Sequence, residues 1–152
     1  MDKTTRIYSG PLSLFGAKAQ IAALEKGLAF ELVMVPFDRD DNYLPKHPEV
    51  LRVNPKAQVP VLVDDEVELF DSTQIFEYLE DRYPTPPLWP REVAARARAR
   101  QLELRADEVF FPQIYKLFGL QDHMQGAAAQ AACVACHPLY GHVGALLARG
   151  QC

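Results

Sequence analysis

The sequence predicts a chain in two parts: an α/β domain whose elements follow the order βαβ-ββα, and then an all-helical region. Three observations lead to this prediction. Short β-branched and aromatic runs alternate with helical patterns in residues 6–83, and four of the twelve prolines fall within residues 84–90. Beyond that cluster the composition is rich in Ala, Arg and Leu. We therefore expect domains at residues 1–83 and 91–152, joined by a stiff linker at 84–90.

A strand, a helix and a second strand form the first half of the α/β domain. Residues 6–9 (RIYS) are a β-branched and aromatic run that ends at Gly10. Apolar residues then recur at helical spacing over residues 15–27, where Gly27 is the stop signal, and residues 30–35 (FELVMV) are again rich in strand formers. A strand, helix and strand over about thirty residues form a βαβ unit, whose crossover implies parallel strands.

Two further strands and a helix complete the domain. A polar stretch with at most one helical turn, near residues 48–53, leads to the runs 59–63 (VPVLV) and 67–70 (VELF). The short turn between these runs predicts an antiparallel hairpin. Residues 71–83 follow with a helical apolar face.

The net charge of -4 conceals an uneven distribution. Residues 1–83 carry nine Lys/Arg and fifteen Asp/Glu, whereas residues 84–152 carry seven and five. Neither part has the basic excess of a nucleic-acid-binding protein, so we expect no nucleic-acid partner.

Neither a membrane segment nor an export signal is evident. No apolar run approaches the roughly 18 residues that span a bilayer, and the N-terminus lacks the apolar stretch of a signal peptide. We therefore expect a cytoplasmic protein without a membrane partner. The three cysteines, Cys133, Cys136 and Cys152, are an odd number late in the chain, which indicates reduced thiols and not a disulfide scaffold.

An ordered set of unlike motifs runs through residues 6–90. It comprises a serine after the first strand, an Asn-Pro run that ends in Val-Pro, an Asp-Ser pair at a helix start and a Tyr-Pro helix end: Ser13, Asn54-Pro55-x-x-Gln58-Val59-Pro60, Asp71-Ser72 and Tyr83-Pro84. This set resembles the N-terminal domain of the cytosolic glutathione transferases, most closely the serine-type, bacterial-looking members. The resemblance implies a thioredoxin-like fold for residues 1–83. It also implies that residues 91–152 are a shortened, partial helical domain, because family members have a larger one.

Ser13 is the candidate catalytic residue, because serine-type members of the family place at this point the hydroxyl that donates to the glutathione sulfur. A free thiol has a pKa near 8.5, so only about 3% is thiolate at pH 7. A hydrogen bond to the charged form contributes about 1.5–3 kcal/mol, which lowers the thiol pKa by about one to two units. Ser13 is equally a natural N-cap for the following helix. Ser9 and Tyr8 are alternative donors, although packing is the simpler role for Tyr8.

Asp71 and Ser72 are candidates for the anion receptor that glutathione requires. A helix N-terminus offers free N–H groups and a favourable dipole to a carboxylate, and the Asp71 carboxylate can pair an ammonium. Capping of the helix alone is the simpler role for both residues.

Val59 and Pro60 are candidates for a backbone clamp. A cis Val59-Pro60 bond resembles the family's arrangement, in which exposed backbone pairs with the tripeptide like an added strand; a trans proline at a strand start is the alternative. Gln58 and Lys46 resemble residues that contact the γ-glutamyl and glycine ends, and Lys46 fits a solvated loop lysine equally well. The sequence departs from the family at Ala57, which is often glycine there.

Residues 133–137 (CVACH) match C-x-x-C-H, the attachment pattern of c-type haem. The missing export signal and the Ala-rich helical context speak against haem at Cys133, Cys136 and His137, and these are too few ligands for a closed zinc site. We expect a chance occurrence on a helix, without haem or metal.

An aromatic stretch at helical spacing surrounds Tyr115. Core packing accounts for most of these aromatic side chains. In the family, however, this helix borders the electrophile pocket, so Tyr115 is a candidate contact for a hydrophobic electrophile.

The function implied by the resemblance is a glutathione transferase that conjugates glutathione to an electrophile, in the manner of a detoxification enzyme and as a homodimer. The alternatives are a non-catalytic binding or assembly module of the same fold, or a glutathione-dependent isomerase, dehalogenase or peroxidase at the same site. The first half of the chain contains no cysteine, which weighs against a dithiol oxidoreductase.

Overall fold

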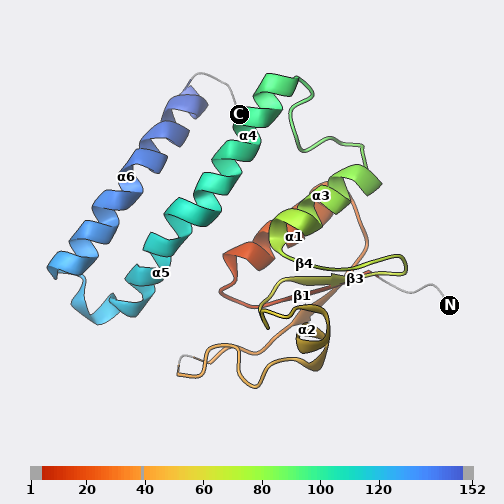
Figure 1. Cartoon of the computed structure of the whole chain (residues 1–152), viewed down its shortest axis with the longest axis horizontal. Coiled ribbons are helices and arrows are strands. Elements are labelled where there is room, and N and C mark those ends of the chain that lie inside the picture. The colour runs from red at the N-terminus through yellow and green to blue at the C-terminus, as the bar shows by residue number, and fades with distance from the viewer. Residues whose placement is uncertain (1–4, 39, 149–152) are drawn as a thin grey trace. The chain divides into compact units, whose positions relative to one another are not determined.

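Figure 1 shows the computed structural model of the chain, which describes residues 5–38 and 40–148. The chain divides into unit 1, Met1–Trp89, and unit 2, Pro90–Cys152. Each unit has its own secondary structure: unit 1 is mixed and unit 2 is helical.

A four-stranded mixed sheet is the frame of unit 1. Its strand order is β2-β1-β3-β4, and its strands are β1 Arg6–Ser9, β2 Glu31–Met34, β3 Val61–Val63 and β4 Glu68–Phe70. β1 pairs with β2 in parallel and with β3 antiparallel, and β3 and β4 form an antiparallel hairpin. The predicted βαβ-ββα order and both predicted pairings are confirmed.

Helices cover both faces of this sheet. α1 (Leu14–Glu25) and α3 (Ser72–Arg82) lie side by side on one face, and the short α2 (Pro48–Val53) lies on the other (Figure 1). Three layers result, with the sheet in the middle.

Two apolar cores form because neighbouring residues of a strand point to opposite faces of the sheet. Ile7 and Leu62 are buried under α1 and α3. Tyr8 and Val61, one residue away in each strand, are buried on the other face with Val50 of α2. The central strands β1 and β3 are therefore covered on both faces. This packing holds in place the segments that follow β1 and precede β3.

The ends of two elements follow local chemistry. β3 begins at Val61, two residues later than predicted, because Pro60 has no N–H to donate to a neighbouring strand. α1 ends in a Schellman motif: Gly27 has φ +66°, its N–H donates to Leu24 O and the Leu28 N–H donates to Ala23 O. The stop signal predicted at Gly27 is thus confirmed.

Unit 2 is helical throughout its described part, as predicted. Its helices are α4 (Val93–Arg105), α5 (Phe111–Gly119) and α6 (Ala127–Ala148), and the π-helical turn η1 (Ala106–Phe110) joins α4 to α5. A 3-10 turn, η2 (Gln121–His123), leads to α6, which packs against α5 and η1.

α6 is more apolar than the sequence analysis allowed. It has 22 residues without a charged side chain, and by length and composition it could cross a bilayer. The expectation that no segment approaches this length was wrong, because uncharged polar residues and glycines interrupt the apolar run without adding charge. Its buried side chains are Ala129, Ala132 and Cys136. A core helix of a soluble protein can have the same length and composition.

Candidate functional site

Three chain segments meet at one edge of the sheet of unit 1. In the antiparallel register, Tyr8 of β1 is opposite Val61 of β3, and Val61 is opposite Phe70 of β4. The residues after β1, before β3 and after β4 therefore leave the sheet side by side. This edge, here called the site edge, brings together the Ser13 turn, the Val59-Pro60 segment and the start of α3.

Ser13 is the N-cap of α1. Its backbone is extended (φ -83°, ψ 103°), and its Oγ accepts a hydrogen bond from the Gly16 N–H at 2.9 Å. The Ser13 N–H closes a turn on Gly10 O at 3.0 Å. Because Oγ uses a lone pair in the capping bond, the hydroxyl proton is not consumed by it. The capping role expected as the alternative is confirmed, and it leaves the hydroxyl able to donate.

The start of α1 is packed closely against the end of β1. A Cβ at Gly16 would lie 2.0 Å from Ser9 Oγ, so the helix approaches the strand where only glycine fits. Gln20 Nε2 donates to Ser9 Oγ at 2.9 Å and to Gly16 O at 3.1 Å. Ser9 is fully buried and Tyr8 is 1% exposed, so neither alternative donor is accessible at the surface.

The Val59-Pro60 peptide bond is cis. Among the described residues, neither the N–H nor the C=O of Val59 takes part in a backbone hydrogen bond. Asn54, a buried residue to which the sequence analysis gave no role, orders this segment: its Nδ2 donates to Gln58 O at 2.6 Å and its Oδ1 accepts from Lys56 N at 2.9 Å. Within the described ranges, the N–H and C=O of Val59 at this edge of the sheet thus have backbone hydrogen-bonding capacity that is not used.

Asp71 caps α3 in an uncommon backbone conformation, with φ +76° and ψ 127°. Its Oδ1 accepts the N–H groups of Thr73 at 3.0 Å and Gln74 at 3.3 Å, and its side chain is exposed. Ser72, the first residue of the helix, is buried. Non-glycine residues in such conformations cost about 1–3 kcal/mol and cluster at ligand sites. Capping is confirmed for Asp71. Its strained backbone is in addition a feature typical of ligand sites.

Lys18 connects the two helix starts. Its Nζ donates to the Thr73 hydroxyl at 2.9 Å, which ties the first turns of α1 and α3 together. Ser13 and Ser72 therefore belong to helices whose N-termini are held at the same end of the sheet.

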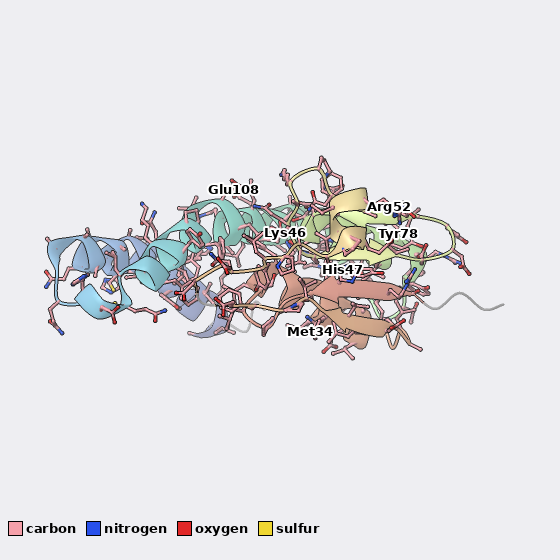
Figure 2. All side chains as sticks on the ribbon, turned by 90° about the horizontal axis from the view of Figure 1, so that it is seen from below. Met34, Lys46, His47, Arg52, Tyr78 and Glu108 are labelled. Carbon is pink, nitrogen blue, oxygen red and sulfur yellow. The ribbon has the colours of Figure 1, made fainter. Side chains whose placement is uncertain are left out.

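Of the remaining predicted contacts, Gln58 directly precedes Val59, Lys46 also lies on unit 1, and Tyr115 lies on unit 2. Gln58 is exposed, and Lys46 is half-buried immediately before His47 at the start of α2 (Figure 2). His47 caps α2, with Nδ1 accepting the Glu49 N–H at 3.2 Å. Tyr115 lies on α5 of unit 2 with 65% of its surface exposed and its ring 6.3 Å from that of Phe111.

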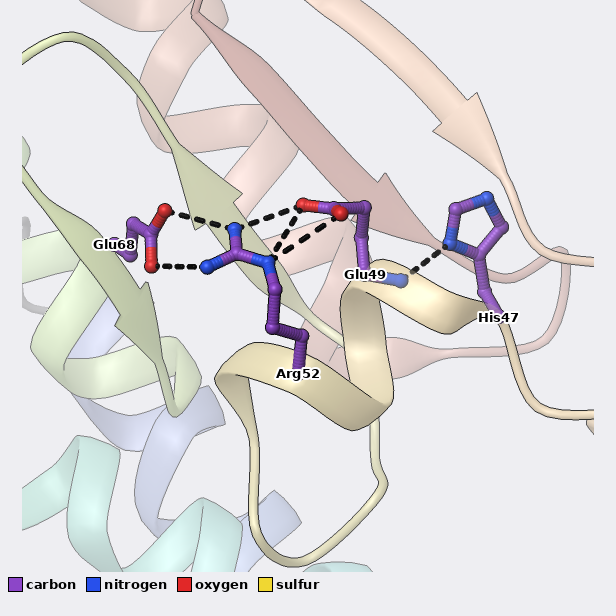
Figure 3. A network of polar contacts seen from close by, with 4 residues as sticks. All are labelled: His47, Glu49, Arg52 and Glu68. Atoms are coloured by element: carbon purple, nitrogen blue, oxygen red, sulfur yellow. Dashed lines mark hydrogen bonds and ion pairs between the residues drawn. The ribbon is translucent and has the colours of Figure 1, made fainter.

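An ion-pair network fastens α2 to the sheet (Figure 3). Arg52 makes two bonds of 2.7 Å to the Glu68 carboxylate on β4 and one of 2.8 Å to Glu49. The hydrogen bonds that Arg52 donates to Glu68, and next those to Glu49, raise the pKa of Arg52, and the Arg52 guanidinium lowers the pKa of Glu49. The network has a structural role, because it positions the segment that carries Lys46.

The C-x-x-C-H residues all lie on α6. Cys133 is half-buried and Cys136 is buried, and both are free thiols. Burial, and next the neighbouring Cys133, raise the pKa of Cys136, which makes it less reactive. Within the described ranges no three His, Cys, Asp or Glu side chains are grouped for a metal ion, and Cys152 lies outside those ranges.

The fold and the site edge define a class of protein. The sequence matches the family model of the glutathione S-transferase N-terminal domain over residues 7–87, which is more than half of the chain. The chain therefore belongs to the glutathione S-transferase family, with a thioredoxin-like N-terminal domain followed by a helical region.

Individual relatives agree with this assignment. The stringent starvation protein A homolog of Coxiella burnetii is 38% identical over 107 residues, covering 69% of this chain and 47% of that protein. Glutathione S-transferase Z1 of Arabidopsis thaliana is 34% identical over 96 residues, covering 63% and 42%. The chain thus spans about half the length of the curated relatives it matches.

Solved structures extend the similarity to most of the chain. A glutathione S-transferase of Methylobacterium radiotolerans, in complex with glutathione sulfonate, aligns with a TM-score of 0.74 and 28% identity, covering 94% of this chain and 66% of that one. The helical region therefore follows the family fold as far as the alignment extends.

Proposed function

We propose that unit 1 binds glutathione and that the Ser13 hydroxyl stabilises its thiolate for transfer to an electrophile. The observation that carries the proposal is the capping geometry of Ser13: Oγ accepts the Gly16 N–H at 2.9 Å, which orients the hydroxyl and leaves its proton for the sulfur. A donor fixed in this way does not have to be reorganised when the thiolate forms.

The tripeptide would be held by the two other segments of the site edge. The unused N–H and C=O of Val59 suit the cysteinyl unit, which would bind as an added strand. The start of α3 suits the α-amino acid end, with Ser72 and the helix N-terminus facing its carboxylate and Asp71 facing its ammonium. Gln58 and Lys46 are proposed contacts for the peptide ends.

In the reaction, the glutathione sulfur forms a bond to an electrophilic carbon while the leaving group departs with its electron pair. Binding both reactants supplies proximity, and the Ser13 hydrogen bond raises the thiolate fraction. Tyr115 is the proposed contact for a hydrophobic electrophile. Conjugation of this kind would be a detoxification activity in the cytoplasm, and a homodimer is the proposed assembly.

One observation favours a second function. The 38%-identical relative bears the name stringent starvation protein A homolog, which does not refer to glutathione transfer. The same site would then serve a non-catalytic binding or assembly module. A glutathione-dependent isomerase, dehalogenase or peroxidase would also use it.

The test compares wild type with Ser13→Gly and Ser13→Ala. Glycine at an N-cap costs only a few tenths of a kcal/mol, whereas alanine costs about 1 kcal/mol, so Ser13→Gly removes the hydroxyl with little loss of the cap. We expect the thiol pKa of bound glutathione to rise by about one to two units in both variants, with conjugation of a chlorodinitrobenzene falling about 10- to 100-fold at pH 6.5. Calorimetry with glutathione completes the experiment. Binding without conjugation in wild type would favour the binding module, and unchanged activity in Ser13→Gly would remove Ser13 from the mechanism.

A further inference from the structure

Lys26 is a buried cation at the end of α1. Its side chain is 0% exposed, and an isolated ammonium is costly to bury. Its Nζ lies 2.5 Å from Glu80 Oε2 on α3 and donates to the carbonyl of Pro86 at 2.6 Å. The charge is therefore compensated jointly by α3 and by the proline-rich segment that follows it.

Glu80 also binds the backbone of that segment directly. Its two oxygens accept the Leu88 N–H at 3.1 Å, and Oε1 accepts the Trp89 N–H at 3.1 Å. Burial alone would raise the pKa of Glu80, but the hydrogen bonds from Lys26, Leu88 and Trp89 outweigh it and lower that pKa. The carboxylate is thus ionised at neutral pH and bound on several sides.

Residues 84–89 (PTPPLW), here called the strap, have one further polar attachment to α3, because the Trp89 indole N–H donates to Glu77 Oε1 at 3.0 Å. Three of the six are prolines, so the strap has only three backbone N–H groups, and two of these end on Glu80. It carries no charged side chain. Its apolar contacts are at its end: Leu88 packs against the core under α1 and α3, and the Trp89 ring lies 4.8 Å from that of Phe76.

We propose that Glu80 is a conformational latch that keeps the strap folded onto unit 1. Lys26, Glu80 and the backbone of residues 86, 88 and 89 form this Glu80 latch. While it is closed, the chain leaves unit 1 only after Trp89. When it is open, the strap becomes a tether of six residues, which adds up to about 20 Å of reach between α3 and unit 2. The stiffness of this connection then comes from the half-buried Glu80 carboxylate in addition to the prolines and the bond from Trp89 Nε1 to Glu77.

The chain carries its own reporter for the latch, since Trp89 is its single tryptophan. The main test variant is Lys26→Met with Glu80→Ala, which removes the carboxylate without leaving the ammonium buried and unpaired. Asp81→Asn is the matched control, because it removes an exposed carboxylate from the next position of α3. Lys26→Met with Glu80→Gln is a milder variant that keeps one acceptor oxygen and a similar volume.

We expect hydrogen exchange at the Leu88 and Trp89 amides to accelerate at least about tenfold in the Lys26→Met, Glu80→Ala variant, and less in the glutamine variant. Trp89 emission should shift to the red and become easier to quench with acrylamide, while circular dichroism stays that of wild type. Asp81→Asn should match wild type in all three measurements. If the alanine variant does not fold, the glutamine variant decides. Exchange and emission that stay as in wild type in a folded variant would overturn the proposal, as would equal effects in Asp81→Asn. None of these readouts requires glutathione.

Discussion

At the scale of single residues, the backbone of the site edge stores conformational strain. Ala57 has φ +53°, a left-handed conformation that costs an L-residue about 1–2 kcal/mol. It occupies the turn that Asn54 closes just before the Val59-Pro60 segment. The position at which the sequence departs from the glycine common in its family is therefore one where glycine would be free of strain.

Ala57→Gly should stabilise unit 1 by about 0.5–1 kcal/mol. The substitution relieves the left-handed strain and loses part of that gain to the larger entropy of glycine in the unfolded chain. Urea unfolding with unchanged m-value is the measurement. A loss of stability would show that the Ala57 side chain makes contacts worth more than the strain.

Asp64 is a residue whose charge contributes to stability through Tyr78. The Tyr78 hydroxyl donates to Asp64 Oδ2 at 2.6 Å, and Oδ1 accepts the N–H groups of Glu66 and Val67 at 2.8 Å each. Burial raises the pKa of Asp64, but these hydrogen bonds outweigh it and leave that pKa below its usual value. The contribution is therefore complete above the unfolded-state pKa of about 3.9 and is lost as the pH falls through the lower folded-state pKa.

Tyr78→Phe should lower the stability of unit 1 at pH 7 by about 1–2 kcal/mol, because Asp64 keeps its backbone partners and loses only the phenol. The variant should lose less stability than wild type between pH 4 and pH 2, since the folded-state pKa of Asp64 returns toward its ordinary value. Urea unfolding across this range measures both effects. An equal loss of stability in the two proteins between pH 4 and pH 2 would contradict the role assigned to the Tyr78–Asp64 hydrogen bond.

At the scale of secondary-structure elements, the structure confirms the predictions that rest on local sequence signals. It differs from the sequence-based expectation where contacts between distant residues determine the backbone. α2 forms at residues 48–53, where at most one helical turn was predicted, and the predicted helix stop at Gly27 is present, because proline at a helix start and glycine at its end act through their own backbone. The π-helical turn Ala106–Phe110 was not predicted. It adds one residue to a helical turn without breaking the helix, so the apolar period hardly changes.

Pro138 is a second irregularity, inside α6. A proline in a helix interior removes one backbone hydrogen bond and clashes with the preceding turn, at about 3 kcal/mol. Pro138 is exposed, so no buried contact offsets this cost. Pro138→Ala should raise the thermal midpoint and the helical circular dichroism of unit 2. Unchanged helicity would mean that the helix has already accommodated the proline at little cost.

At the scale of the whole molecule, the residues of the site edge are easier to predict from the sequence than the residues that hold the surrounding segments in place. Ser13, Val59 and Asp71 were predicted because each stands in a motif that resembles the motifs of the glutathione transferases. Asn54 stood in the same motif, but its bonds to the turn could not be read from it. The Lys26–Glu80 pair joins residues far apart in the chain, and neither has a local pattern that marks it as buried. Support residues of this kind become visible only when the fold brings them together.

Binding of glutathione would connect the site to the stability of the whole of unit 1. A ligand that binds only the folded state adds about 2.7 kcal/mol at a concentration one hundred times its Kd. We expect the thermal midpoint of wild type to rise with glutathione concentration, and Asp71→Asn, which keeps the cap but removes the charge proposed for the ammonium, to shift that response to higher concentrations. Ser13→Gly should retain most of the response, because its hydroxyl is assigned to the thiolate. A midpoint that glutathione does not move in wild type would contradict binding itself, whereas a normal response without conjugation would leave a binding module with an intact glutathione site.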